Sequence, residues 1–88
     1  MIRPFLGKTP QYDTSNYIAD TAVVIGDVTL GPKASIWHHC TLRGDVNFIQ
    51  IGTASNIQDN SVVHVTQCTA PTVIVDYVTV GHGAIIHG

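Results

Sequence analysis

Residues 18–43 of this 88-residue chain read IADTAV-VIGDVT-LGPKAS-IWHHCT-LR, and this stretch decides the fold. An aliphatic residue opens every block of six, at Ile18, Val24, Leu30, Ile36 and Leu42. A smaller residue follows four positions later each time, at Ala22, Val28, Ala34, Cys40 and Val46. Neither the helical period of about 3.6 residues nor the strand period of about 2 produces this repeat. It predicts a triangular solenoid in which each block forms one flat side, with the aliphatic residue inside and the smaller one near a corner.

The same rhythm continues along the rest of the chain, with two interruptions. After a three-residue slip it resumes at Ile51, Ile57 and Val63. After an insertion at about 66–72 it returns at Ile74, Val80 and Ile86. Three blocks, roughly 18 residues, close one coil, and successive coils pair as parallel strands roughly 4.8 Å apart. We therefore expect an all-β protein, with an N-terminal arm at 1–17 and β-helix coils at 18–88 that form a triangular prism.

The composition favours strands, because Ile and Val dominate the apolar residues and β-branched side chains suit sheets. A small antiparallel barrel or sandwich is the alternative, since it also uses short Val- and Ile-rich strands. It would not explain a spacing of six that holds through five consecutive blocks. A chain of this length forms one domain with a modest core, so oligomerisation is a natural source of further burial.

The charge pattern argues against nucleic acid and membrane partners. The net charge is −2 with four Lys and Arg in total, whereas phosphate backbones and anionic membranes bind clustered basic side chains. No apolar run approaches the roughly 18 residues of a membrane span, and residues 1–5 lack the apolar core of a signal peptide. We expect a cytoplasmic protein in which Cys40 and Cys68 are reduced thiols, too few for a disulfide framework.

Counting every third block predicts a column of outward polar residues. Leu42, Val63 and Ile86 stack on one face, so the residue after each of them, Arg43, His64 and His87 in turn, points outward from that face. Two imidazoles roughly 5 Å apart on neighbouring strands can share one zinc ion, because Zn–N bonds are about 2.0–2.1 Å long and the rings can converge.

His82 falls on a different corner, where the counting stacks it on Asp59 with Gln58 alongside. From that corner it cannot easily join the other two histidines of its own chain. The hypothesis that follows is a cyclic trimer with zinc at each interface, bound by His64 and His87 of one chain and His82 of the next. Zinc held by three histidines keeps an open position for water, which is the catalytic arrangement.

The remaining polar features are given simpler interpretations. His38 and His39 fall on an earlier block without stacked partners, so we expect them to be surface residues. Arg43-Gly44-Asp45 matches an adhesion tripeptide, but an Arg–Asp pair that braces a subunit interface fits a cytoplasmic repeat protein better.

Six motifs, in this order, resemble the γ-class carbonic anhydrase family: Leu42-Arg43-Gly44-Asp45, Gln50-Ile51-Gly52, Asn56-Ile57-Gln58-Asp59, Val63-His64-Val65, Val80-Gly81-His82 and Ile86-His87-Gly88. The resemblance runs from about Ile18 to the last residue, and the two later histidines keep the family's separation of five. It implies a homotrimer of left-handed parallel β-helices, a handedness that the spacing alone does not determine. It also implies interfacial zinc held by His64, His82 and His87, for which Fe²⁺ or Co²⁺ are chemically suitable replacements.

The reaction that the resemblance implies is reversible hydration of carbon dioxide to bicarbonate by a zinc-bound hydroxide. Gln58 would hydrogen-bond that hydroxide or orient carbon dioxide. Arg43 would pair across the interface with an acidic side chain, for which Asp59 is the candidate, and Asp45 would brace the same region.

The chain departs from the family in two respects. Well-known active members carry a glutamate directly after the Arg-Gly-Asp run and another after the first histidine, whereas this chain has Val46 and no acid in residues 65–72. Proton export is left to His38, His39 or buffer, with no evident candidate. Members also continue for several more coils and end in a helix that caps the solenoid, so we expect a shortened chain of about three and a half coils that lacks the C-terminal half.

Two other functions fit the same fold. A hexapeptide-repeat acyltransferase also uses interfacial trimer sites, with a histidine as general base. That chemistry needs one histidine, whereas three at these spacings suit a metal. A non-catalytic metal-binding trimeric scaffold is the other alternative, and the missing glutamates favour it.

Overall fold

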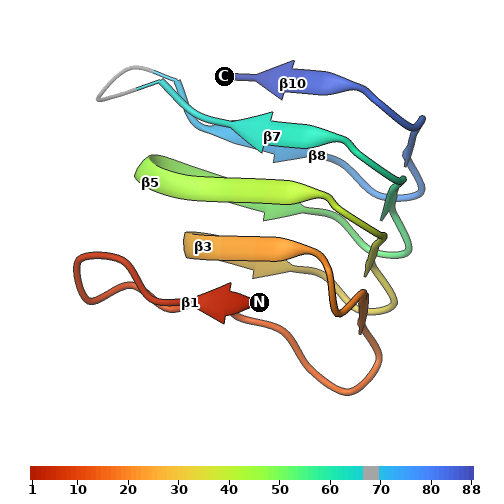
Figure 1. Ribbon diagram of the computed structural model, residues 1–88, viewed down its shortest axis with the longest axis horizontal. Coiled ribbons are helices and arrows are strands. Elements are labelled where there is room, and N and C mark those ends of the chain that lie inside the picture. The colour runs from red at the N-terminus through yellow and green to blue at the C-terminus, as the bar shows by residue number, and fades with distance from the viewer. Residues whose placement is uncertain (67–69) are drawn as a thin grey trace.

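The computed structural model describes residues 1–66 and 70–88, whose path is shown in Figure 1. They form ten strands: β1 (Ile2–Arg3), β2 (Tyr17–Ile18), β3 (Val23–Leu30), β4 (Ser35–Ile36), β5 (Thr41–Ile51), β6 (Asn56–Ile57), β7 (Val62–His64), β8 (Thr72–Ile74), β9 (Thr79–Val80) and β10 (Ile85–His87). Across these two ranges, no helix has the length and apolar character needed to traverse a bilayer. Cys68, predicted to be a reduced thiol, lies outside the described residues.

The described strands pair in parallel and occupy three faces of a solenoid (Figure 1). The first face contains β1, the first halves of β3 and β5, then β7 and β10. The second face contains the later halves of β3 and β5 together with β8. The third face contains β2, β4, β6 and β9. The predicted all-β parallel solenoid is confirmed.

The register on the first face matches the six-residue counting. Leu42 is paired with Val63, and Val63 with Ile86. Val24 and Ile2 continue this column below Leu42, so the chain winds four times between Ile2 and Ile86. The expected N-terminal arm therefore contributes β1 to the first face, and the solenoid is longer than the three and a half coils counted from the repeat alone.

The three-residue slip is a bulge at the corner between the first and second faces. Residues 45–48 of β5 lie opposite the single residue Asp27 of β3. The expectation that Val46 is a corner residue of the core is wrong, because Val46 is 41% exposed and the fully buried Ile49 pairs with Val28 instead. The extra residues turn outward before the strand resumes, which the count from Leu42 could not show.

The inward columns form a continuous core. The aliphatic residues of the middle coils have no exposed surface, namely Val24, Ile36, Leu42, Ile57 and Val63. Each such side chain contributes roughly 1.5–3 kcal/mol by leaving water. Of the smaller residues predicted at the corners, Ala22, Ala34 and Cys40 are equally buried, and so are Ser55 and Ser61 in the later blocks.

The corner between the third and first faces repeats one backbone turn in successive coils. His39, Asn60 and Gly83 occupy it with φ values of 59°, 62° and 70°. A left-handed backbone costs a residue with a Cβ roughly 1–2 kcal/mol. Hydrogen bonds between coils offset that cost: Asn60 N donates to His38 O at 3.0 Å, and Gly83 N donates to Asp59 O at 2.9 Å. The residue that precedes each turn therefore projects from the same corner in each coil.

Candidate metal centre

His64 and His87 lie side by side on the first face. They end β7 and β10, and they are paired partners in the parallel ladder. Their ring centroids are 4.9 Å apart, with an interplanar angle of 80°. The strand spacing sets this separation, because paired residues on neighbouring parallel strands point the same way roughly 4.8 Å apart. The predicted stacking of these two imidazoles is confirmed.

Arg43 continues the column below His64, its ladder partner. Its Nη1 lies 3.3 Å from Asp45 Oδ2 of the same chain. The other carboxylate oxygen, Asp45 Oδ1, lies 3.8 Å from His64 Nε2 and accepts a hydrogen bond from Val46 N at 2.8 Å. Asp45 is therefore situated between the guanidinium and the first imidazole, where a carboxylate can fix the orientation of a ligating ring.

The ring of His87 is held on one side by its own chain. Its Nδ1 lies 2.9 Å from the carbonyl oxygen of Gly88 and 3.4 Å from Thr66 Oγ1. A ring nitrogen that donates to a carbonyl carries the proton, which leaves the other nitrogen free to bind a metal. The chemistry of this side chain therefore fits a zinc ligand.

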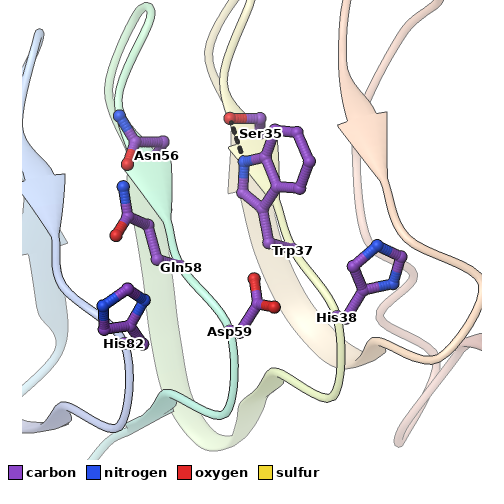
Figure 2. A pocket seen from close by; sticks show the side chains of 7 residues that line it. All are labelled: Ser35, Trp37, His38, Asn56, Gln58, Asp59 and His82. Atoms are coloured by element: carbon purple, nitrogen blue, oxygen red, sulfur yellow. Dashed lines mark hydrogen bonds between the residues drawn. The ribbon is translucent and has the colours of Figure 1, made fainter.

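His82 lies on the other side of the corner, in the turn between β9 and β10. It lines a surface pocket of about 610 Å³ together with Ser35, Trp37, His38, Asn56, Gln58 and Asp59 (Figure 2). Gln58 and Asp59 directly follow β6, and the hydrogen bond from Gly83 N to Asp59 O ties the two coils together at this point. The predicted grouping of His82 with Gln58 and Asp59 is confirmed.

One chain does not complete a three-ligand site. Within residues 1–66 and 70–88, no three His, Cys, Asp or Glu side chains come close enough together to hold one metal ion. His64 and His87 stand on the first face, whereas His82 lines the pocket of the third face. Each chain thus presents a pair of imidazoles and, around the corner, a third one. Imidazole nitrogens are ligands that zinc prefers.

The sequence reasoning missed His38. The expectation that it lacks stacked partners is wrong, because β4 pairs with β6 and β6 with β9. His38, Asp59 and His82 consequently occupy equivalent positions on three successive coils, and all three line the pocket (Figure 2). The counting that grouped Asp59 with His82, extended one coil down, would have found this. Trp37 adds an aromatic wall, with its ring centroid 4.7 Å from that of Tyr17.

Cys40 is a core thiol, as predicted. Its side chain has no exposed surface, and Sγ donates to the carbonyl oxygen of Gln58 at 3.0 Å. Burial raises the pKa of this thiol above its ordinary value, so it stays protonated at neutral pH. Its chemistry is that of a small apolar core residue with one hydrogen bond to the neighbouring coil.

Two curated relatives place the chain among known sequences. Over 86 residues it is 51% identical to γ carbonic anhydrase 2, mitochondrial, of Arabidopsis thaliana, which covers 92% of this chain and 31% of that protein. Over 87 residues it is 48% identical to a carbonic anhydrase of Geobacillus kaustophilus, which covers 99% and 47%. Over nearly its whole length the chain is thus similar to proteins named as carbonic anhydrases, of the γ class in the plant case. It spans about a third to a half of the length of these relatives.

A solved structure supports the fold of this carbonic anhydrase-like chain. A hexapeptide transferase family protein from Anaplasma phagocytophilum superposes with a TM-score of 0.91 at 46% sequence identity, over 98% of this chain and 49% of that one. No family model matches the chain. The hexapeptide repeat is therefore shared by relatives named for two different chemistries, and the residues of the site must decide between them.

Proposed function

We propose that the chain is a zinc-dependent carbonic anhydrase-like enzyme that hydrates carbon dioxide reversibly to bicarbonate. The observation that carries the proposal is the pair of imidazoles of His64 and His87, whose centroids are 4.9 Å apart on one face. The separate position of His82 suits a site that a second subunit completes. Two relatives named as carbonic anhydrases support the same activity.

The site lies between subunits of a homotrimer. The first face of one subunit meets the third-face corner of the next, so that His64 and His87 of one chain and His82 of its neighbour hold the metal. Arg43 uses one guanidinium nitrogen on Asp45 of its own chain. A guanidinium has five N–H donors, so Arg43 also pairs with Asp59 of the neighbour and ties the two subunits together.

Each residue then has a defined task. When bound, zinc supplies a Lewis acid and lowers the pKa of a water molecule to about 7, and Fe²⁺ or Co²⁺ suit the same imidazoles. Gln58, which lines the pocket beside His82, offers both an amide oxygen and an NH₂ group to orient water or carbon dioxide. Asp45, 3.8 Å from His64 Nε2, keeps that imidazole in position.

Subunit mixing tests the location of the site. The variant His82→Ala keeps the imidazole pair, and the double variant His64→Ala/His87→Ala keeps His82. Neither variant binds zinc tightly alone. After both are unfolded and refolded together, about one quarter of the interfaces combine an intact pair with an intact His82, because each interface draws its two sides independently.

The readouts are zinc content by mass spectrometry and carbon dioxide hydration by stopped flow. We expect both to recover in the mixture to about a quarter of the wild-type values, in line with that count. A mixture with no more zinc than the separate variants contradicts a site shared between chains. Wild-type protein that binds zinc without hydrating carbon dioxide above the buffer rate contradicts the enzyme and leaves the metal-binding scaffold.

An acyltransferase is the second candidate, favoured by the structural match to a hexapeptide transferase family protein. A histidine of the pocket, His38 or His82, would act as general base toward a hydroxyl or amine. Isothermal titration with acetyl-coenzyme A separates the two candidates. Saturable binding in zinc-free protein supports the transferase, and no detectable heat supports the anhydrase.

A further inference from the structure

Carbon dioxide hydration produces one proton per turnover, and the site needs an acceptor for it. In the balanced reaction a water O–H bond breaks, a C–O bond forms, and carbon dioxide plus water become bicarbonate plus a proton. An efficient acceptor has a pKa close to the working pH, which favours imidazole over carboxylates, whose pKa values are about 4. The inference that follows rests on the proposed function.

The chain has five histidines, all within the described residues, and three of them form the proposed metal site. The other two are His38 and His39. His39 occupies the left-handed turn with a φ of 59°, donates its backbone N–H to Thr21 Oγ1 at 3.0 Å, and does not line the pocket. His38 does line the pocket, and it is exposed in the single chain.

We propose that His38 accepts the proton from the site and passes it to solvent. His82, Asp59 and His38 stand on three successive coils, with Asp59 in the middle (Figure 2). His82 and His38 are two coil spacings apart, which is roughly 10 Å. The open pocket that both imidazoles line gives the proton a path through solvent from one to the other. His38 is the one of the three that lies furthest from the proposed metal ligand His82, at the other end of this column.

Polar residues lie next to His38 on the neighbouring coils. Asp59 is above it, and the turn below carries Asp20 and Thr21, whose Oγ1 lies 3.5 Å from His38 Nδ1. Next to it in the chain are His39 and the edge of the Trp37 ring, 6.3 Å away between centroids.

Oxygen-18 exchange between carbon dioxide and water tests this role, because it reports two rates separately. The first is the interconversion of carbon dioxide and bicarbonate. The second is the release of labelled water, which requires a proton delivered to the site. Zinc-loaded wild-type protein is compared with His38→Ala, His38→Gln and the matched control His39→Asn, since asparagine tolerates the left-handed turn.

In His38→Ala and His38→Gln we expect water release to fall by about tenfold or more, with interconversion unchanged within about twofold. Added imidazole restores water release in His38→Ala, and His39→Asn behaves as wild type. Water release that is unchanged in both His38 variants overturns the inference, as does an equal loss in His39→Asn. If wild-type protein shows no interconversion, the proposed function fails first, and the inference fails with it.

Chemical modification supplies a readout that does not depend on activity. Diethyl pyrocarbonate acylates accessible imidazoles, and peptide mass spectrometry identifies which ones react. In the zinc-loaded assembly we expect His38 to react as it does in zinc-free protein, while His64, His82 and His87 become protected. Protection of His38 by zinc would mean that its ring is ligating or covered, and would overturn its role as a solvent-exposed acceptor.

Discussion

The substitution Ser61→Ala removes a hydroxyl that fixes the turn between β9 and β10, which carries His82. Ser61 is fully buried in the corner below that turn. Its Oγ donates to the carbonyl oxygen of Gly81 at 2.9 Å and accepts from Ala84 N at 3.3 Å. These two backbone groups flank His82, so the hydroxyl holds the segment that carries the third proposed ligand.

The magnitude follows from the two hydrogen bonds that are lost. Each net hydrogen bond contributes about 0.5–1.5 kcal/mol, and a partner left unpaired in the interior costs about 1–3 kcal/mol. Gly81 is exposed, so water can replace one of the two bonds. We therefore expect a loss of about 1–2 kcal/mol in the free energy of unfolding. For a chain of this size that is a decrease of about 4–16 °C in Tm.

Ser55→Ala is the matched control. Ser55 is equally buried, donates to the carbonyl oxygen of Val75 at 2.5 Å and accepts from Val78 N at 3.0 Å, at a corner that carries no proposed ligand. We expect both variants to lose similar stability in thermal denaturation followed by circular dichroism. Zinc affinity, measured by competition with a chelating dye, should fall by about tenfold in Ser61→Ala alone. Equal zinc affinities in the two variants would refute the reasoning that this hydroxyl positions His82.

Three further predictions concern the fold. Gly44→Ala should destabilise the protein by about 1–3 kcal/mol, because the added Cβ would lie 2.6 Å from the carbonyl oxygen of Asp27. The control Gly81→Ala, whose added Cβ would have no neighbouring atom within 4 Å, should change stability by less than about 0.5 kcal/mol. Equal urea midpoints for the two variants would contradict this. Leu42→Ala should cost about 2–5 kcal/mol in the same assay, since the side chain is fully buried. Burial raises the pKa of Cys40, so the folded thiol stays neutral while the unfolded one ionises near pH 8.5. The contribution of the Cys40 thiol to the free energy of unfolding is complete below that pH and declines as the pH rises above it. Cys40→Ala should abolish this pH dependence.

Much of the candidate site could be predicted from the sequence, because parallel coils keep their register over long distances. Every inward aliphatic residue must stack on the one a coil below, so the residues after Val63 and Ile86 had to be neighbours. The insertion after His64 did not disturb this, since additional residues can leave the solenoid at a corner without shifting the strands that follow. The same reasoning linked Asp59 with His82.

One feature could not be read from the repeat in this way, and another was overlooked. At the bulge, Val46 and Ile49 are both β-branched and apolar, so composition could not tell which one enters the core; the path of residues 45–48 decided it. His38 belongs to the pocket through the pairing of β4 with β6, which places it one coil below Asp59, and the counting that linked Asp59 with His82 had not been carried to that coil.

The sequence by itself determined the six-residue period, the parallel solenoid and the pairing of His64 with His87. These depend on burial and strand spacing, which repeat from coil to coil. The tertiary structure alone decided the backbone path at the corner between the third and first faces. That outcome depends on turns with left-handed backbone and on hydrogen bonds between coils, such as Gly83 N to Asp59 O. Such turns form in residues as different as His39, Asn60 and Gly83, because the hydrogen bonds between coils stabilise them more than the identity of the side chain does.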